Sequence, residues 1–155
     1  MRILRLITLA VLVIVSVQTA KVSAKDIVVP KMYMFGFAAS FNDSIVHMTE
    51  IQAVDNVWIE QKTKFMVGRE NYSYQLRDFL ADKYQMGHRT CVVFYNQDRQ
   101  KLEKEYLKMK RIYTTGKKKV KKNDKKAAKT NNDLRILSAN DFQFRTIDMS
   151  IETDE

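Results

Sequence analysis

The run RTCVVFYN at residues 89–96 constrains the fold of this chain more than any other feature. A nearly unbroken apolar run of this length predicts a strand that is buried on both faces. The polar residues Gln97 and Asp98 follow it and mark its end. We therefore expect residues 89–96 to form the central strand of a sheet.

An amphipathic helix is predicted on each side of this strand. The first begins near Asn71 and ends at Gly87, and the second begins at an Asp98 cap and ends at Gly116. Their apolar faces, which repeat at helical spacing, are Tyr72, Leu76, Phe79, Leu80 and Tyr84 in the first and Leu102, Tyr106, Met109 and Tyr113 in the second. Helix, strand and helix therefore follow one another through a single core.

An antiparallel hairpin is predicted before the first helix. Residues 32–39 alternate aromatic with small or flexible side chains, as a strand does, and residues 45–51 form a second strand. Between them, residues 40–44 have the composition of a turn. Next we expect a short helix, capped by Asp55 and carrying the apolar residues 57–59.

Two extended runs are predicted near the C-terminus, at residues 134–137 and from Phe142 to about Ile151. The apolar residues of the second run change face near Arg145, which predicts a bulge or a strand end. The expected fold is α/β of the α+β kind. It is a small two-layer sandwich in which a mixed sheet of about four strands carries two main helices on one face, in the order β-β-α-β-α-β. A right-handed parallel crossover is expected between the strand at 89–96 and the strand from Phe142.

The first 24 residues have the pattern of a secretory signal peptide. Arg2 and Arg5 precede the apolar segment 6–17, and small residues at 22–24 suit cleavage after Ala24. As a helix the apolar segment rises only about 18 Å, too short for the ~30 Å core of a bilayer. We expect a mature chain, residues 25–155, that forms one domain without a transmembrane span and is periplasmic or secreted.

The formal net charge of +9 is concentrated in one segment. Without residues 117–129 and the signal peptide the chain is close to neutral, so we do not expect a nucleic-acid partner. Residues 117–132 are predicted to form a disordered Lys-rich insertion, which either contacts an anionic envelope lipid or glycan or only keeps the protein soluble. The candidate contacts are Lys117, Lys118, Lys119, Lys121, Lys122, Lys125, Lys126 and Lys129.

Cys91 is the only cysteine, so it forms no disulfide within the chain. With His88 it has the spacing of two metal ligands, or of a thiol nucleophile and its base. A structural zinc site needs two more ligands, however, and an apolar strand raises the pKa of a thiol. We therefore expect a buried, unreactive Cys91, and neither a metal nor a cofactor.

Carboxylates in the first helix suggest a possible enzyme. Asp78 and Asp82 share one helical face, and together with Glu70 they could supply the acid and the base of a hydrolase that cleaves an envelope glycan. The neighbouring Arg77 and Lys83 favour instead a solvated helix face.

The stretch 68–77 interleaves Arg and Tyr at the start of the same helix. Backbone N–H groups, guanidinium groups and aromatic rings can together hold an anionic or sugar-like ligand. The candidate binding residues are Arg69, Glu70, Tyr72, Tyr74 and Arg77. The alternative is a capping segment in which Tyr72 packs inward while Arg69 and Glu70 pair on the surface.

Four stretches, YMFG at 33–36, FNDS at 41–44, GRENYSYQL at 68–76 and RTCVVF at 89–94, accompany the predicted signal peptide. With it, they resemble a group of short exported bacterial proteins of unknown function. The resemblance implies an exported location and no particular activity. The sequence thus predicts a small exported binding or accessory protein that is not an enzyme, and its alternatives are a carboxylate-dependent hydrolase and a protein that binds anionic surfaces through the Lys-rich segment.

Overall fold

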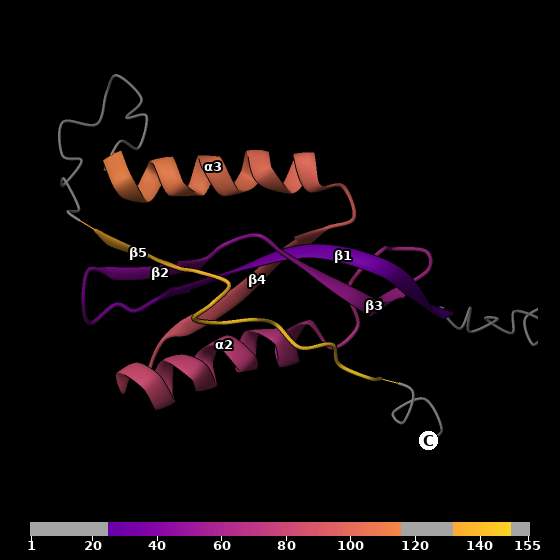
Figure 1. Ribbon diagram of the computed structural model, residues 1–155, viewed down its shortest axis with the longest axis horizontal. Coiled ribbons are helices and arrows are strands. Elements are labelled where there is room, and N and C mark those ends of the chain that lie inside the picture. Colours follow the sequence, from indigo (N-terminus) through magenta and orange to yellow (C-terminus); the bar gives the residue numbers. More distant parts are fainter. Residues whose placement is uncertain (1–24, 116–131, 150–155) are drawn as a thin grey trace, which may run out of the picture.

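A mixed sheet of five strands with two helices forms this α+β protein (Figure 1). A computed structural model describes residues 25–115 and 132–149. The strands are β1 (Asp26–Ala39), β2 (Ile45–Thr49), β3 (Gln52–Glu60), β4 (Thr90–Asn96) and β5 (Asp133–Leu137). The helices are α2 (Arg69–Tyr84) and α3 (Arg99–Thr115).

The long strand β1, and not β4, is the centre of the sheet. β4 pairs with one edge of β1, where Phe94 lies opposite Phe35. β3 and β2 lie end to end along the other edge, and all three neighbours run antiparallel to β1. The predicted hairpin at residues 32–51 is confirmed, whereas the prediction that residues 89–96 form the central strand is wrong. Within the described residues, β4 pairs with β1 alone and is an edge strand.

β5 completes the sheet by pairing in parallel with β2. β4 and β5, the strands that precede and follow α3, therefore run in the same direction, with β1 and β2 between them. The predicted crossover ends on β5, because residues 142–149 do not form a strand.

The two helices cover opposite faces of the sheet (Figure 1). Successive side chains of a strand point to opposite faces, and β1 shows this directly. Met34 belongs to a core cluster with Leu76 of α2, whereas Phe35 belongs to a second cluster with Leu102 of α3. The prediction that both helices lie on one face is therefore wrong. Each helix packs on the sheet as a layer of its own.

The absence of a side chain at Gly36 lets α2 approach the sheet closely. A Cβ atom at this position would lie 2.6 Å from Cδ2 of Leu76, which is fully buried. The Gly36 N–H donates to the Thr49 hydroxyl at 2.9 Å. Gly36 thus joins β1 to the end of β2 beneath α2.

Both helices lie close to their predicted bounds, although α2 ends at Tyr84, three residues before the predicted stop at Gly87. α2 begins after Gly68, whose φ of 64° is left-handed, and its C-cap residue Gln85 is also left-handed, with a φ of 57°. At the start of α3, Asp98 Oδ1 accepts the N–H groups of Gln100 and Lys101 at 2.9 and 3.3 Å, which confirms the predicted cap.

Residues 55–59 lie within β3 and do not form the predicted short helix. Val57 and Ile59 are buried, and Asp55 lies opposite Lys31 of β1. The left-handed residue Asn56, with a φ of 54°, interrupts the alternation of the strand.

Residues 142–149, which we call the C-terminal strap, run in an extended path over the face of the sheet that carries α2. Phe142 and Phe144 are buried and contact each other edge to face at 4.9 Å. Phe142 also packs against Phe79 of α2. The strap therefore closes one side of the larger core.

Candidate functional site

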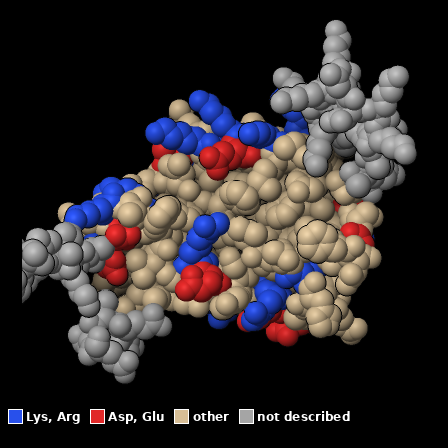
Figure 2. Space-filling view, turned by 180° about the vertical axis from the view of Figure 1, so that it is seen from behind, with Lys and Arg blue, Asp and Glu red and all other residues tan. Residues whose placement is uncertain are grey.

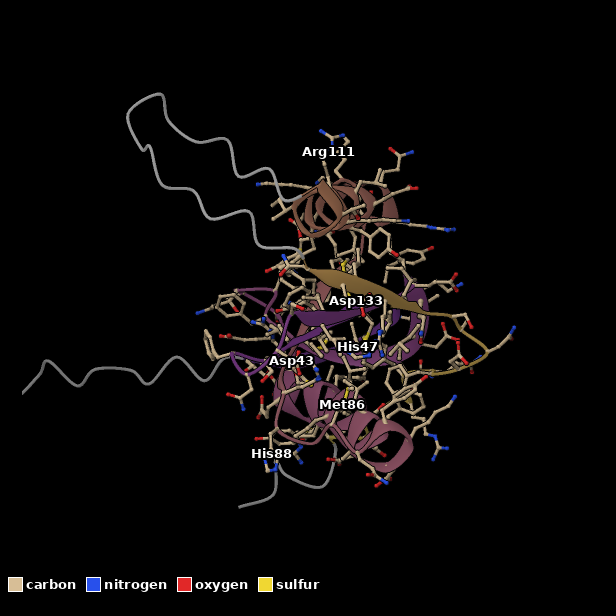
Figure 3. All side chains as sticks on the ribbon, turned by 90° about the vertical axis from the view of Figure 1, so that its left-hand side faces the viewer. Asp43, His47, Met86, His88, Arg111 and Asp133 are labelled. Carbon is tan, nitrogen blue, oxygen red and sulfur yellow. The ribbon has the colours of Figure 1, made fainter. Side chains whose placement is uncertain are left out.

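A small pocket lies at the end of the sheet where the turn 40–44 meets the loop 85–89. We call these two segments together the turn site. In Figure 3, Asp43 from the turn and Met86 and His88 from the loop lie at the same end of the molecule as His47 of β2. The pocket has a volume of about 200 Å³ and is lined by Ser40, Asn42, Asp43, Gln85, Met86, His88 and Arg89.

Arg89 ties the two segments together from inside the protein. Its side chain is only 2% exposed. One guanidinium N–H donates to the Asp43 carboxylate at 2.6 Å, and another donates to the Ile45 carbonyl oxygen at 2.6 Å. A buried charge is costly unless it is paired, so this pair fixes the turn against the start of β4. The Arg89 hydrogen bond also holds the pKa of Asp43 below its ordinary value.

The turn is also constrained by its own side chains. Asp43 Oδ1 accepts the Ile45 N–H at 2.9 Å, and the Ser40 hydroxyl oxygen accepts the Asn42 N–H at 3.2 Å. Such local bonds pre-form a turn. Between them Phe41 is fully exposed. Single exposed apolar residues are common, so it is the constrained backbone beneath Phe41 that sets this aromatic side chain apart.

A neutral histidine lies behind the pocket. His47 is 1% exposed, and its ring stacks on Tyr84 with 5.9 Å between the ring centroids. Burial, and then the nearby charges of Arg89 and Arg135, lower the pKa of His47 to about 4. His47 is therefore uncharged at neutral pH. His47 Nδ1 and Arg89 Nε are both buried without a hydrogen-bond partner in the described part of the chain, so polar groups extend inward behind the pocket.

The binding residues predicted in the stretch 68–77 do not converge on one place. They are Arg69, Glu70, Tyr72, Tyr74 and Arg77. Tyr72 is 1% exposed and belongs to the core. Arg69 lies over the ring of Tyr95, 5.8 Å from its centroid, whereas Arg77 lies over the ring of Tyr74 at 4.4 Å. The two arginines thus contact different aromatic rings, and Tyr72 is out of reach of a ligand.

The three carboxylates of the predicted hydrolase are exposed on α2. Glu70, Asp78 and Asp82 all lie at the surface, and Asp78 pairs with the adjacent Arg77 at 2.9 Å. Acid and base catalysis needs groups that converge in a cleft. This arrangement is that of a solvated helix face, so the geometry does not favour a hydrolase.

Cys91 and His88 do not form a site together. Cys91 is partly buried in β4, and burial raises the pKa of its thiol to about 11, whereas His88 is exposed in the pocket. Within residues 25–115 and 132–149 no group of three or more His, Cys, Asp and Glu residues is placed to hold a metal ion. None of the helices in these same ranges is long and apolar enough to cross a membrane. The predicted signal peptide and the lysines from Lys117 to Lys129 lie outside the described residues.

The sequence contained a usable signal for the turn site. An aromatic residue inside a short polar turn, Phe41 in SFNDS, has few apolar neighbours to pack against. An arginine directly before an apolar strand, Arg89, must either reach solvent or find a buried partner. Comparisons of the chain with protein-family models, with curated proteins and with solved structures give no match.

Proposed function

We propose that this chain is a small binding or accessory protein without catalytic activity, that it works in the periplasm or is secreted, and that the turn site contacts a protein partner through Phe41. The observation that carries the proposal is a fully exposed aromatic side chain on a turn held by the buried Arg89. Aromatic side chains contribute much of the affinity of protein interfaces. A turn that is already ordered avoids the entropic cost of being ordered on binding.

The surroundings of Phe41 suit this role. An interface combines an apolar centre with a polar rim, and the pocket next to the turn offers Ser40, Asn42 and His88 for the rim. The Asp43 carboxylate already forms an ion pair with Arg89, so most of its charge is neutralised before a partner binds.

The test is affinity capture from an envelope extract of the source cells, with quantitative mass spectrometry of the retained proteins. The mature chain is compared with Phe41→Ser and with a matched control, Phe65→Ser, which changes another exposed phenylalanine in a different turn. We expect the control to retain its partner, and we expect Phe41→Ser to lower the affinity for that partner by about 30-fold, the effect of removing a strong interface anchor. Circular dichroism checks that both variants fold. A partner that binds both variants equally would contradict the proposal.

Export is supported by the pattern of residues 1–24, namely two arginines, an apolar segment and small residues before Lys25. The mass of the native protein from fractionated cells provides the measurement. A mature chain that begins at Lys25 in the periplasm or the medium is expected. An intact Met1 in the cytoplasmic fraction would rule out this part of the proposal.

A further inference from the structure

Within the part of the chain that the structure describes, positive charge is concentrated on α3. The helix carries six Lys and Arg residues and two Glu residues, whereas the other described residues carry ten Lys and Arg against twelve Asp and Glu. The described part of the protein is thus polarised, with one positive element on a body that is slightly negative. Such asymmetry directs a protein toward an anionic partner.

The geometry of α3 separates these charges from the core. Leu102 is fully buried, and Tyr106 meets the ring of Phe35 edge to face at 5.2 Å, so this side of the helix faces the sheet. Lys104 and Lys108 lie four residues apart on the opposite side and are exposed. Figure 2 shows Lys and Arg side chains along the edge of the molecule that carries α3.

Four of the six cationic side chains of α3 form one row along the helix. Lys101, Lys104, Lys108 and Arg111 follow at spacings of three and four residues, which places them on one face. All four are exposed, and Figure 3 shows Arg111 on the side of α3 that faces away from the sheet. Lys101 lies 3.8 Å from Asp98 in the first turn, an exposed pair that water and salt screen.

We infer that α3 docks lengthwise on an anionic lipid surface through this row. Over 17 residues the helix is about 25 Å long, so the row can meet several head groups at once. Leu107, which is 51% exposed beside the row, suits a surface that has apolar chains beneath its charged groups. A soluble polyanion would use the charges but would leave Leu107 in water, so the combination favours a lipid surface.

This inference does not rest on the proposed function, because α3 and the turn site are separate surfaces. A protein that docks on a membrane through α3 still needs the turn site for a partner, and Phe41→Ser should leave binding to lipid unchanged. Failure of one proposal can therefore be told apart from failure of the other.

The experiment is co-sedimentation of the mature chain with vesicles of phosphatidylcholine alone or with added phosphatidylglycerol. One variant combines Lys101→Gln, Lys104→Gln and Lys108→Gln. The matched control makes the same change of charge outside α3, with Lys31→Gln, Lys62→Gln and Lys83→Gln, all of them exposed. Lys83 belongs to α2, which covers the opposite face of the sheet. The Lys-rich segment 117–129 is intact in both, so its contribution is the same in each.

Each lysine at an anionic membrane contributes roughly fivefold to binding, so the α3 variant should bind about 100-fold more weakly at 0.1 M salt. The control should lose less than about threefold, since charges beyond ~10 Å of the surface are screened at 0.1 M salt. Binding of the unchanged chain should fall as salt is added. Equal losses in the two variants, undiminished binding by the α3 variant, or equal binding to vesicles without phosphatidylglycerol would each overturn the inference.

Discussion

The C-terminal strap is held in place by side-chain amides and not by pairing within the sheet. Gln52 donates through Nε2 to the Phe142 carbonyl oxygen at 2.8 Å and accepts the Phe144 N–H through Oε1 at 2.9 Å. One glutamine side chain thus makes the two backbone hydrogen bonds that a neighbouring strand would otherwise make with the strap. We predict that Gln52→Ala loosens the strap while the rest of the protein stays folded.

The size of the effect follows from these two bonds. Both backbone groups are partly buried, and in the variant each loses the one hydrogen-bond partner that it has among the described residues. A hydrogen bond of this kind contributes about 1 kcal/mol, so the free energy of opening the strap should fall by about 2 kcal/mol. The open population should then rise about 30-fold. Gln52→Glu should also loosen the strap, because a carboxylate can still accept the Phe144 N–H but cannot donate to the Phe142 oxygen.

Cleavage by an arginine-specific protease after Arg145 measures this opening and leaves the Lys-rich segment uncut. Arg145 is exposed, but its N–H and C=O groups are bonded to the side chain of Gln75, so cleavage needs the strap to open. Release of a fragment that begins at Thr146 is followed by mass spectrometry. The control is Gln143→Ala, which removes an exposed glutamine of the strap itself. A cleavage rate for Gln52→Ala within about twofold of this control would refute the reasoning.

Two further predictions concern buried titratable groups. The folded protein holds the pKa of His47 near 4 against an ordinary value of 6.5, so the unfolded chain binds more protons between these values. The free energy of unfolding should fall by roughly 3 kcal/mol as the pH drops from about 6.5 to 4. In denaturant unfolding, His47→Gln should remove this pH dependence, whereas the control His88→Gln should keep it. An equal change of unfolding free energy with pH in the two variants would exclude His47 as its source. The thiol pKa of Cys91 is raised to about 11, so we expect no rapid labelling by a thiol reagent at neutral pH. Cys91→Ala should lower the free energy of unfolding by about 1 kcal/mol. Fast labelling of the folded protein would show instead that the thiol is accessible.

The two long helices could be predicted from the sequence because their signals are local. In α2 the apolar residues recur at helical spacing, and in α3 Asp98 stands next to the turn that it caps. At β3 the cap rule gave a wrong prediction. Asp55 stands before the apolar residues 57–59 as a helix cap would, but these residues continue the strand. The left-handed Asn56 shifts the facing of the strand between Val54 and Val57, both of which are buried.

The placement of the helices was within reach of the sequence argument, although the prediction was wrong. The run 89–96 is apolar along its whole length, which indicates cover on both faces. Two helices on a single face cannot supply such cover, whereas one helix on each face can. β4 is thus apolar because α2 and α3 lie on either side of it, even though it is an edge strand. The composition of a strand reports how its faces are covered, and it does not report its position in the sheet.

The turn site illustrates what a local pattern cannot supply. Arg89 and Asp43 are 46 residues apart in the sequence, and nothing in the neighbourhood of either residue identifies the other as its partner. Burial of the guanidinium creates the need for a partner, and the pairing of β1 with both β2 and β4 brings Asp43 to it. The need could be predicted from an arginine at the head of an apolar strand. The identity of the partner could not be predicted, since it depends on two long-range strand pairings. The constrained turn that carries Phe41 depends on the same Arg89–Asp43 pair.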